Sequence, residues 1–106
     1  MATIEEFKQL ELVIAQIKEV EEHPNADRLY VVKIDTGKEI KQLVAGIRTS
    51  YSKENLIGRR VVVVNNLQPA VIRGVESQGM ILAASDENGI SVLGPDREVA
   101  LGSTVK

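Results

Sequence analysis

The sequence predicts an all-β domain in which five main strands close into a small barrel. Short apolar stretches rich in valine and isoleucine recur along the chain and are separated by turn-forming residues. One stretch, residues 61–64, is four consecutive valines, as expected for a strand that is buried on both sides or closes a barrel. Helix signals are confined to two short segments, near Thr3 and near Ser52.

A short helix followed by a long strand is expected at the N-terminal end. Thr3 and Glu6 fit a capping box, and Ile4 and Phe7 lie one turn apart, so this short helix should pack on another surface. Residues 10–20 then read as a strand, with an irregular alternation near residues 15–16 that predicts a bend or bulge.

Two turns separate the next strands. Residues 23–27 and 36–38 contain the proline, glycine, asparagine and aspartate that favour chain reversal. Residues 29–36 and 42–47 are therefore predicted as the second and third strands. Ser52 can cap a single helical turn that Gly58 ends.

Residues 61–64 and 80–85 are predicted as the fourth and fifth main strands. Asn88-Gly89 is a hairpin signal that leads into residues 90–93, and a last short strand over residues 99–105 is expected after the turn at 94–96. Five main strands with a helical turn between the third and fourth match the Greek-key barrel of the OB-fold. Another small barrel or a sandwich is the alternative, because strand order cannot be read from periodicity.

The composition predicts one soluble domain, residues 1–106. The hydrophobic fraction of 43% and the charged fraction of 26% are ordinary for a globular protein, and no apolar run is long enough to cross a membrane. The chain has no cysteine, which excludes disulfides, a thiol nucleophile and a zinc-thiolate site and fits a reducing compartment. A cytoplasmic protein that does not act at a membrane is therefore expected.

Catalytic chemistry has little support in this sequence. The only histidine, His23, precedes Pro24 in a turn, where a structural role is expected. The neighbouring carboxylates at 21–22 and 86–87 flank turns, as surface charges do, and the glycines form no phosphate-binding loop. No catalytic residue, metal ligand or cofactor is predicted, and the protein is not expected to be an enzyme.

Positive charge is concentrated in the middle of a chain whose formal net charge is -2. Residues 40–75 carry six basic side chains and one acidic side chain, whereas residues 1–39 and 76–106 are both net acidic. Such segregation predicts a positive face on an acidic body, which would suit a phosphate backbone; scattered surface charges are the alternative.

The range 58–84 has the features of a recognition surface. A polar elbow at residues 65–69 follows the four valines, and a loop at 73–80 follows the elbow, with Gly74 and Gly79 placed so that the backbone could approach a ligand closely. Its amides, hydroxyl and thioether suit one or two bases of a folded RNA, while three aromatic residues are too few for a single-strand stacking platform. In the alternative, Met80 simply begins a core strand and Ser77 forms a turn.

Several motifs resemble the tRNA-binding domain, a module found at the C-terminus of bacterial methionyl-tRNA synthetases, in stand-alone dimeric proteins, in EMAP-II-like cofactors and in the phenylalanyl-tRNA synthetase β subunit. The motifs lie at residues 23–29, 33–37, 44–47, 66–69 and, above all, 73–84. The resemblance implies an OB-fold with a short N-terminal helix and C-terminal dimerisation strands that binds tRNA without strong sequence selectivity. It also implies a homodimeric accessory module or β subunit, with the methionyl-tRNA synthetase catalytic subunit as a partner. Carried over by position, the tRNA-binding residues are Arg28, Lys33, Asn66, Gln68, Arg73, Ser77, Gln78 and Met80.

Three positions differ from the family pattern. Val13 stands where arginine is frequent, and Gln68 and Val71 stand where lysine is frequent, which predicts modest affinity for tRNA. Two alternative functions use the same fold, a peptide-binding chaperone resembling CsaA and a protein-docking module on a synthetase. The Ser-Gln-Gly-Met pattern at 77–80 follows the tRNA binders rather than CsaA.

Overall fold

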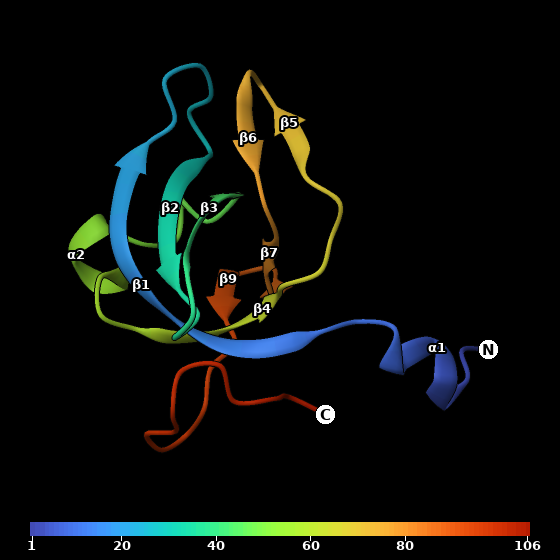
Figure 1. The fold of residues 1–106 in the computed structure, drawn as a ribbon. Helices are drawn as coiled ribbons and strands as arrows, with labels where there is room; N and C mark the ends of the chain where they lie inside the picture. Colours follow the sequence, from blue (N-terminus) through green and yellow to red (C-terminus); the bar gives the residue numbers. More distant parts are fainter.

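The computed structural model describes residues 1–106 and shows a curled, five-stranded antiparallel sheet with two short helices and two added hairpins (Figure 1). The sheet has the order β3-β2-β1-β4-β7. Its strands are β1 (Leu12–Glu22), β2 (Tyr30–Asp35), β3 (Ile40–Ala45), β4 (Arg60–Val64) and β7 (Met80–Ile81). The hairpins are β5 (Ala70–Ile72) with β6 (Val75–Ser77), and β8 (Ala83–Asp86) with β9 (Gly89–Val92). The helices are α1 (Ile4–Lys8) and α2 (Lys53–Leu56).

One backbone bond and two side chains, rather than a regular strand ladder, join β3 to the segment that links β6 and β7. Gln78 N–H donates to Gln42 O at 2.8 Å, and Gln42 N–H donates to the Gln78 side-chain oxygen at 2.9 Å. One step along the strand, Val44 N–H donates to Ser77 Oγ at 3.0 Å. These bonds close the curled sheet on itself, and the predicted all-β, OB-like barrel is confirmed.

The four valines of β4 separate two apolar clusters. The first and third valines are fully buried in the barrel interior, within a main core of 13 residues. The second and fourth belong to a smaller cluster on the outer face of β1 and β4, against which Val99 and Val105 pack. Burial of this strand on both sides therefore depends on the C-terminal residues, which run below the barrel in Figure 1.

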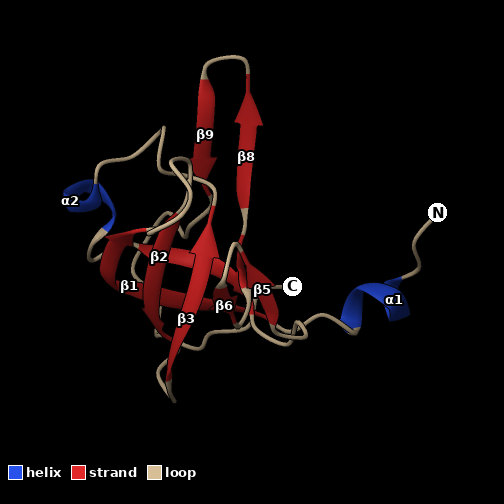
Figure 2. Ribbon diagram, turned by 90° about the horizontal axis from the view of Figure 1, so that it is seen from above, coloured by secondary structure: helices blue, strands red, loops and turns tan.

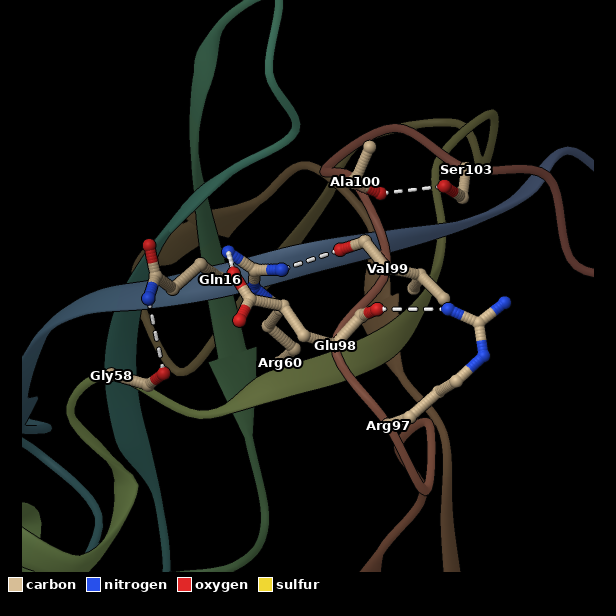
Figure 3. Close-up of polar contacts among 8 residues, drawn as sticks. All are labelled: Gln16, Gly58, Arg60, Arg97, Glu98, Val99, Ala100 and Ser103. Carbon is tan, nitrogen blue, oxygen red and sulfur yellow. Dashed lines mark hydrogen bonds and ion pairs between the residues drawn. The ribbon is translucent and has the colours of Figure 1, made fainter.

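Polar contacts hold the C-terminal segment, residues 93–106, against the barrel (Figure 3). Arg60 of β4 donates to Val99 O and forms an ion pair with Glu98 at 3.2 Å. Where a strand over residues 99–105 was expected, the structure has a single bridge between Val13 and Thr104. The strand is interrupted because Gly102 takes a φ of +86° and reverses the chain locally.

Two other strands differ in detail from the prediction. The fifth main strand is split at Leu82, whose N–H donates to Val62 O at 2.9 Å while its carbonyl accepts from Leu93 N–H at 3.0 Å. The irregularity in the first strand lies between Ile17 and Glu19, where the pairing with β2 shifts register. Both predicted helix caps are confirmed, the capping box before α1 and the Ser52 cap before α2.

Two elements project from the barrel, the β8–β9 hairpin and α1 (Figure 2). α1 has five residues and none of them is buried. No helix in the structure is long and apolar enough to span a bilayer.

Candidate nucleic-acid interface

Two segments that are far apart in the sequence lie side by side at one end of the barrel, at the top of Figure 1. One is loop 23–29 between β1 and β2, and the other is the turn between β5 and β6. They line a shallow hollow whose walls include Asn25, Arg28 and Arg73. Both arginines are exposed, so the hollow is where two of the predicted tRNA-binding residues meet.

The turn that carries Arg73 is tight and has an unusual backbone. Arg73 and Gly74 have φ angles of +52° and +89°, and they connect the paired residues Ile72 and Val75. Two consecutive residues with positive φ are typical of a type I′ hairpin turn. Gly74 is thus required by the turn itself, while a positive φ at a non-glycine residue is uncommon and is concentrated at functional sites.

The basic residues of the range 40–75 do not form one free positive face. Arg48 pairs with Glu22 at 3.0 Å, and Arg60 pairs with Glu98 at 3.2 Å. Arg59 lies over an aromatic ring, 5.3 Å from its centroid. The cations of this segment that contact loop 23–29 are Arg48 and Arg73, so the positive charge near the hollow is local.

Lys33, another predicted contact, lies on β2 outside the residues that line the hollow. Its strand alternates buried and half-buried residues, and Lys33 is one of the half-buried ones. Glu19 of β1 and Gln42 of β3 are its cross-strand partners. Lys33 therefore adds a single positive charge to the outer face of the sheet, between two polar neighbours.

Ser77 and Gln78 are engaged in closing the barrel. The Ser77 hydroxyl is buried, accepts from Val44 N–H and donates to Gly79 O, both at 3.0 Å. Gly79 is itself pressed against β4, because a Cβ atom there would lie 2.8 Å from Val64 O. Packing against the strand thus accounts for this glycine, whereas the sequence had suggested close approach to a ligand.

Asn66 lies in the elbow and anchors the segment that carries α1. Its side-chain oxygen accepts from Glu11 N–H at 2.8 Å, and its amide nitrogen donates to Gln9 O at 2.7 Å. Both polar ends of the side chain are therefore used within the chain.

Gln68 and Met80 line an apolar groove between β3 and the β7–β8 segment. The groove has a volume of about 520 Å³, and 11 of its 16 lining residues are hydrophobic. Met80 and Leu67 are the large apolar side chains that remain substantially exposed at its rim. The two predicted residues thus share one site that is separate from the hollow at Arg28 and Arg73.

The walls of this groove carry unpaired backbone groups. Because Gln42 N–H and Val44 N–H face away from β2, the two-residue period of a strand also directs Val44 O and Gly46 N–H outward, and neither has a hydrogen-bond partner. On the opposite wall, β8 pairs with β9 through alternate residues, which leaves Ala83 and Ser85 with their backbone groups directed away from β9. Along this groove, β3 and the β7–β8 segment are therefore not joined by backbone hydrogen bonds.

The three positions that depart from the family pattern have different environments. Val13 is buried and cannot present a charge at the surface without rearrangement. Gln68 is exposed, and Val71 is 73% exposed on β5. Two of the three missing positive charges therefore belong to positions that face solvent.

Three residues that contact the loop and turn around the hollow were not assigned to this site by the sequence, and of these only Asn25 lines the hollow itself. His23 was expected to be structural, and it is buried and hydrogen-bonded to the carbonyl of Ile72 at 3.0 Å. The Asn25 side chain donates to the carbonyl of Arg73, and the Arg48 side chain donates to the carbonyl of Ala26. Only the neighbourhood of His23, Pro24 and Asn25 in a turn hinted at this role, and its partners could not be read from spacing.

Comparisons with known proteins agree with this fold. The model of a family described as "Putative tRNA binding domain" matches residues 12–104. The chain is 54% identical over 104 residues to a methionine--tRNA ligase of Pyrococcus furiosus, and 51% identical over 102 residues to that of Thermococcus onnurineus. It covers 98% and 96% of its own length in these matches but spans only 14% of either relative.

Solved structures similar to this chain come from two kinds of protein. A MetRS-related protein from Pyrococcus horikoshii has a TM-score of 0.92 at 30% identity, with 100% of this chain and 98% of that chain covered. The chaperone CsaA from Bacillus anthracis has a TM-score of 0.90 at 30% identity, with 100% and 99% covered. The family model and these relatives together show that this chain belongs to the tRNA-binding domain family.

Proposed function

We propose that this protein binds tRNA through the end of the barrel that holds Arg28 and Arg73. The observation that carries the proposal is that two exposed arginines from separate segments line one hollow. Arginine presents several donors that suit phosphate oxygens, and phosphate contacts supply most of the sequence-independent affinity of a protein for nucleic acid. Membership of the tRNA-binding family supports tRNA as the nucleic acid.

The eight predicted residues have three different roles in this proposal. Arg28, Arg73 and Lys33 contact phosphates, and Gln68 and Met80 contact an unpaired base at the rim of the groove. Asn66, Ser77 and Gln78 have a supporting role, because their polar side-chain atoms already form hydrogen bonds with the backbone of this chain. They hold the surface in shape and make no direct contact.

We further propose that the protein is a non-catalytic module that raises the local concentration of tRNA for a methionyl-tRNA synthetase in the cytoplasm. The similarity to a short portion of methionine--tRNA ligases supports this role. A small RNA-binding unit that is linked to or docked on an enzyme increases the effective concentration of the substrate at the active site.

A homodimer is the expected state of this module. α1 has no buried residue, and Ile4, Phe7 and Leu10 are all exposed. A five-residue helix is not stable alone in water, so its apolar face needs a partner surface. We propose that the helix of one copy packs against the C-terminal segment of a second copy, where Leu93 is also exposed.

A gel-shift titration with bulk tRNA at two salt concentrations tests the main proposal. A shift at low salt that weakens as salt rises is expected, because each phosphate contact releases counterions. Absence of any shift at low salt would overturn the RNA function.

One observation favours a second candidate function, the binding of an extended peptide, as in a CsaA-like chaperone or docking module. The groove beside Met80 is apolar and has unpaired backbone groups on both walls. An extended peptide could add a strand at such an edge and place apolar side chains in the groove.

Fluorescence polarisation with a labelled, uncharged valine-rich peptide distinguishes the two functions. The peptide function predicts saturable binding that is insensitive to salt and is lost in Gly46→Pro, which removes an unpaired N–H from the groove wall. Binding of tRNA with no binding of the peptide would eliminate this second candidate.

A further inference from the structure

The loop that carries Arg28 and the turn that carries Arg73 are joined by a short chain of hydrogen bonds. Asn25 N–H donates to His23 Nδ1 at 2.9 Å, and His23 Nε2 lies 3.0 Å from Ile72 O. Arg73 then donates from its guanidinium to Asn25 O at 3.0 Å, and the Asn25 side chain donates back to Arg73 O at 3.4 Å. Loop and hairpin are therefore linked at three successive points.

The position of His23 determines its chemical form in this arrangement. Nδ1 accepts from a backbone N–H and so carries no proton, which leaves Nε2 as the nitrogen that donates to Ile72 O. A neutral imidazole with both nitrogens bound is a rigid bridge between two backbone segments. His23 is only 3% exposed, so water cannot readily replace either bond.

A second arginine fixes the same loop from the barrel side. Arg48 donates to Ala26 O at 3.2 Å and pairs with Glu22 at the end of β1. Loop 23–29 is thus held by Arg48 on one side and by the β5–β6 hairpin on the other. Arg28, by contrast, makes no side-chain hydrogen bond or ion pair and remains available on the exposed face of this fixed loop.

We propose that His23 and Asn25 are positioning residues that lock loop 23–29 onto the β5–β6 hairpin and so hold Arg28 and Arg73 at a fixed spacing for two phosphates of the RNA. The proposal rests on the tRNA-binding function proposed above. Fixing the two arginines before binding removes the entropy cost of ordering two independent loops, which is how pre-organisation raises affinity. Arg73 has a φ of +52° in this turn, and its guanidinium donates to Asn25 O in the facing loop.

The lock is tested first without RNA, by NMR and amide hydrogen exchange on the wild type and on His23→Phe, which keeps a ring but removes both hydrogen bonds. The wild type is expected to show a neutral His23 imidazole protonated on Nε2. In His23→Phe the amides of loop 23–29 and of residues 72–75 should lose protection together. A change confined to one of the two segments, or a His23 protonated on Nδ1, would overturn the lock.

The consequence for RNA is tested by a double-mutant cycle read as affinity and as salt dependence. His23→Phe and Arg73→Ala should each weaken tRNA binding roughly threefold to tenfold and lower the slope of log affinity against log salt by about one contact, about 0.9 on a duplex-like backbone. The double variant should lose less affinity than the sum of the two single losses, because His23 acts in part through Arg73. Additive losses would overturn the positioning role even if both residues matter.

Two controls separate positioning from general stability. Ile34→Val trims the buried core far from the hollow and should lower stability without changing the salt slope. Asn25→Ala replaces His23→Phe if that variant fails to fold. It removes only the 3.4 Å bond from the Asn25 side chain to Arg73 O, and it should change protection and affinity in the same direction by a smaller amount. If the wild type does not bind tRNA at low salt, the proposed function fails, whereas the exchange experiment still decides whether the lock exists.

Discussion

The end of the barrel at loop 23–29 and the N-terminal arm with α1 both lie at the surface. They differ in whether contacts within the chain satisfy their side chains. At loop 23–29, polar groups of the loop and the hairpin bind one another, and the only histidine is buried between them. In the arm, the capping box satisfies the helix start, yet the apolar side chains Ile4, Phe7 and Leu10 remain exposed.

This difference shows what each region needs. At the hollow, the loop and the hairpin are joined by hydrogen bonds within one chain, while the Arg28 side chain remains free for a ligand. The arm leaves apolar surface in water, which is the usual mark of an interface. Substitutions in the two regions should therefore have different effects: those at the hollow should lower stability or RNA affinity, and those in the arm should weaken the proposed self-association.

The largest effect is expected from Phe7→Asp. A charge on the apolar face of α1 should weaken association of the proposed dimer by about 2–4 kcal/mol and so favour the monomer at micromolar concentration. Sedimentation or light scattering measures the change. Lys8→Gln, on the same helix but without apolar contact, is the matched control. Equal masses for Phe7→Asp and the wild type would show that the arm is not the interface.

Ser77→Ala should lower the free energy of unfolding by about 1–3 kcal/mol, because it leaves the Val44 N–H without a partner in a buried position. Urea denaturation measures this cost. Ser85→Ala, at an exposed position whose hydroxyl makes no hydrogen bond, should be nearly neutral. Unchanged stability together with reduced tRNA affinity would instead make Ser77 a direct RNA contact.

Arg73→Ala should weaken tRNA binding roughly threefold at moderate salt, with the fold intact, because one proposed phosphate contact is lost. Met80→Ala should weaken binding without altering the salt slope, since a thioether carries no charge. Arg59→Ala removes one positive charge from a residue that lies over Tyr51 and does not line the hollow, and it serves as the control for Arg73→Ala. If Arg59→Ala and Arg73→Ala were equivalent, only net charge would matter.

The smallest effect is expected from Val71→Lys, which adds a positive charge at a position that is 73% exposed on the β5–β6 hairpin. Affinity for tRNA should rise at most roughly threefold and the salt slope should steepen by up to about 0.9. Val71→Gln controls for the loss of an apolar surface residue. A gain that is the same for lysine and glutamine would rule out a charge effect.

Local chemistry made much of the fold predictable from the sequence. The two helix caps, the turn residues around Pro24 and Gly37, and the run of four valines each act within a few residues, and the structure confirms the elements they predict. Arrangements that depend on distant partners were out of reach. The division of the fifth strand at Leu82 requires bonds from Val62 and Leu93, and no spacing rule contains that information.

The candidate site shows the same limit. Arg28 and Arg73 could be named from motifs, but their meeting at one hollow depends on how the β5–β6 hairpin folds over loop 23–29. The roles of Ser77 and Gln78 in closing the barrel were hidden because an exposed and a buried polar side chain look alike in a sequence. Segregated charge was also misleading as a guide to a free surface, since Arg48 and Arg60 have partners in the acidic parts of the chain.

The C-terminal cover on the outer face of β4 has a consequence for synthesis of the protein. During translation, Leu12 and Ile14 emerge first and Val62 and Val64 follow, whereas Val99 and Val105, which pack on them, are made last. Until then the nascent barrel carries a bare stripe of apolar, β-branched side chains, the kind of surface that pairs with other unfinished chains. In the folded protein the bonds of Arg60 to Val99 O and Glu98 help to hold this covering segment over the stripe.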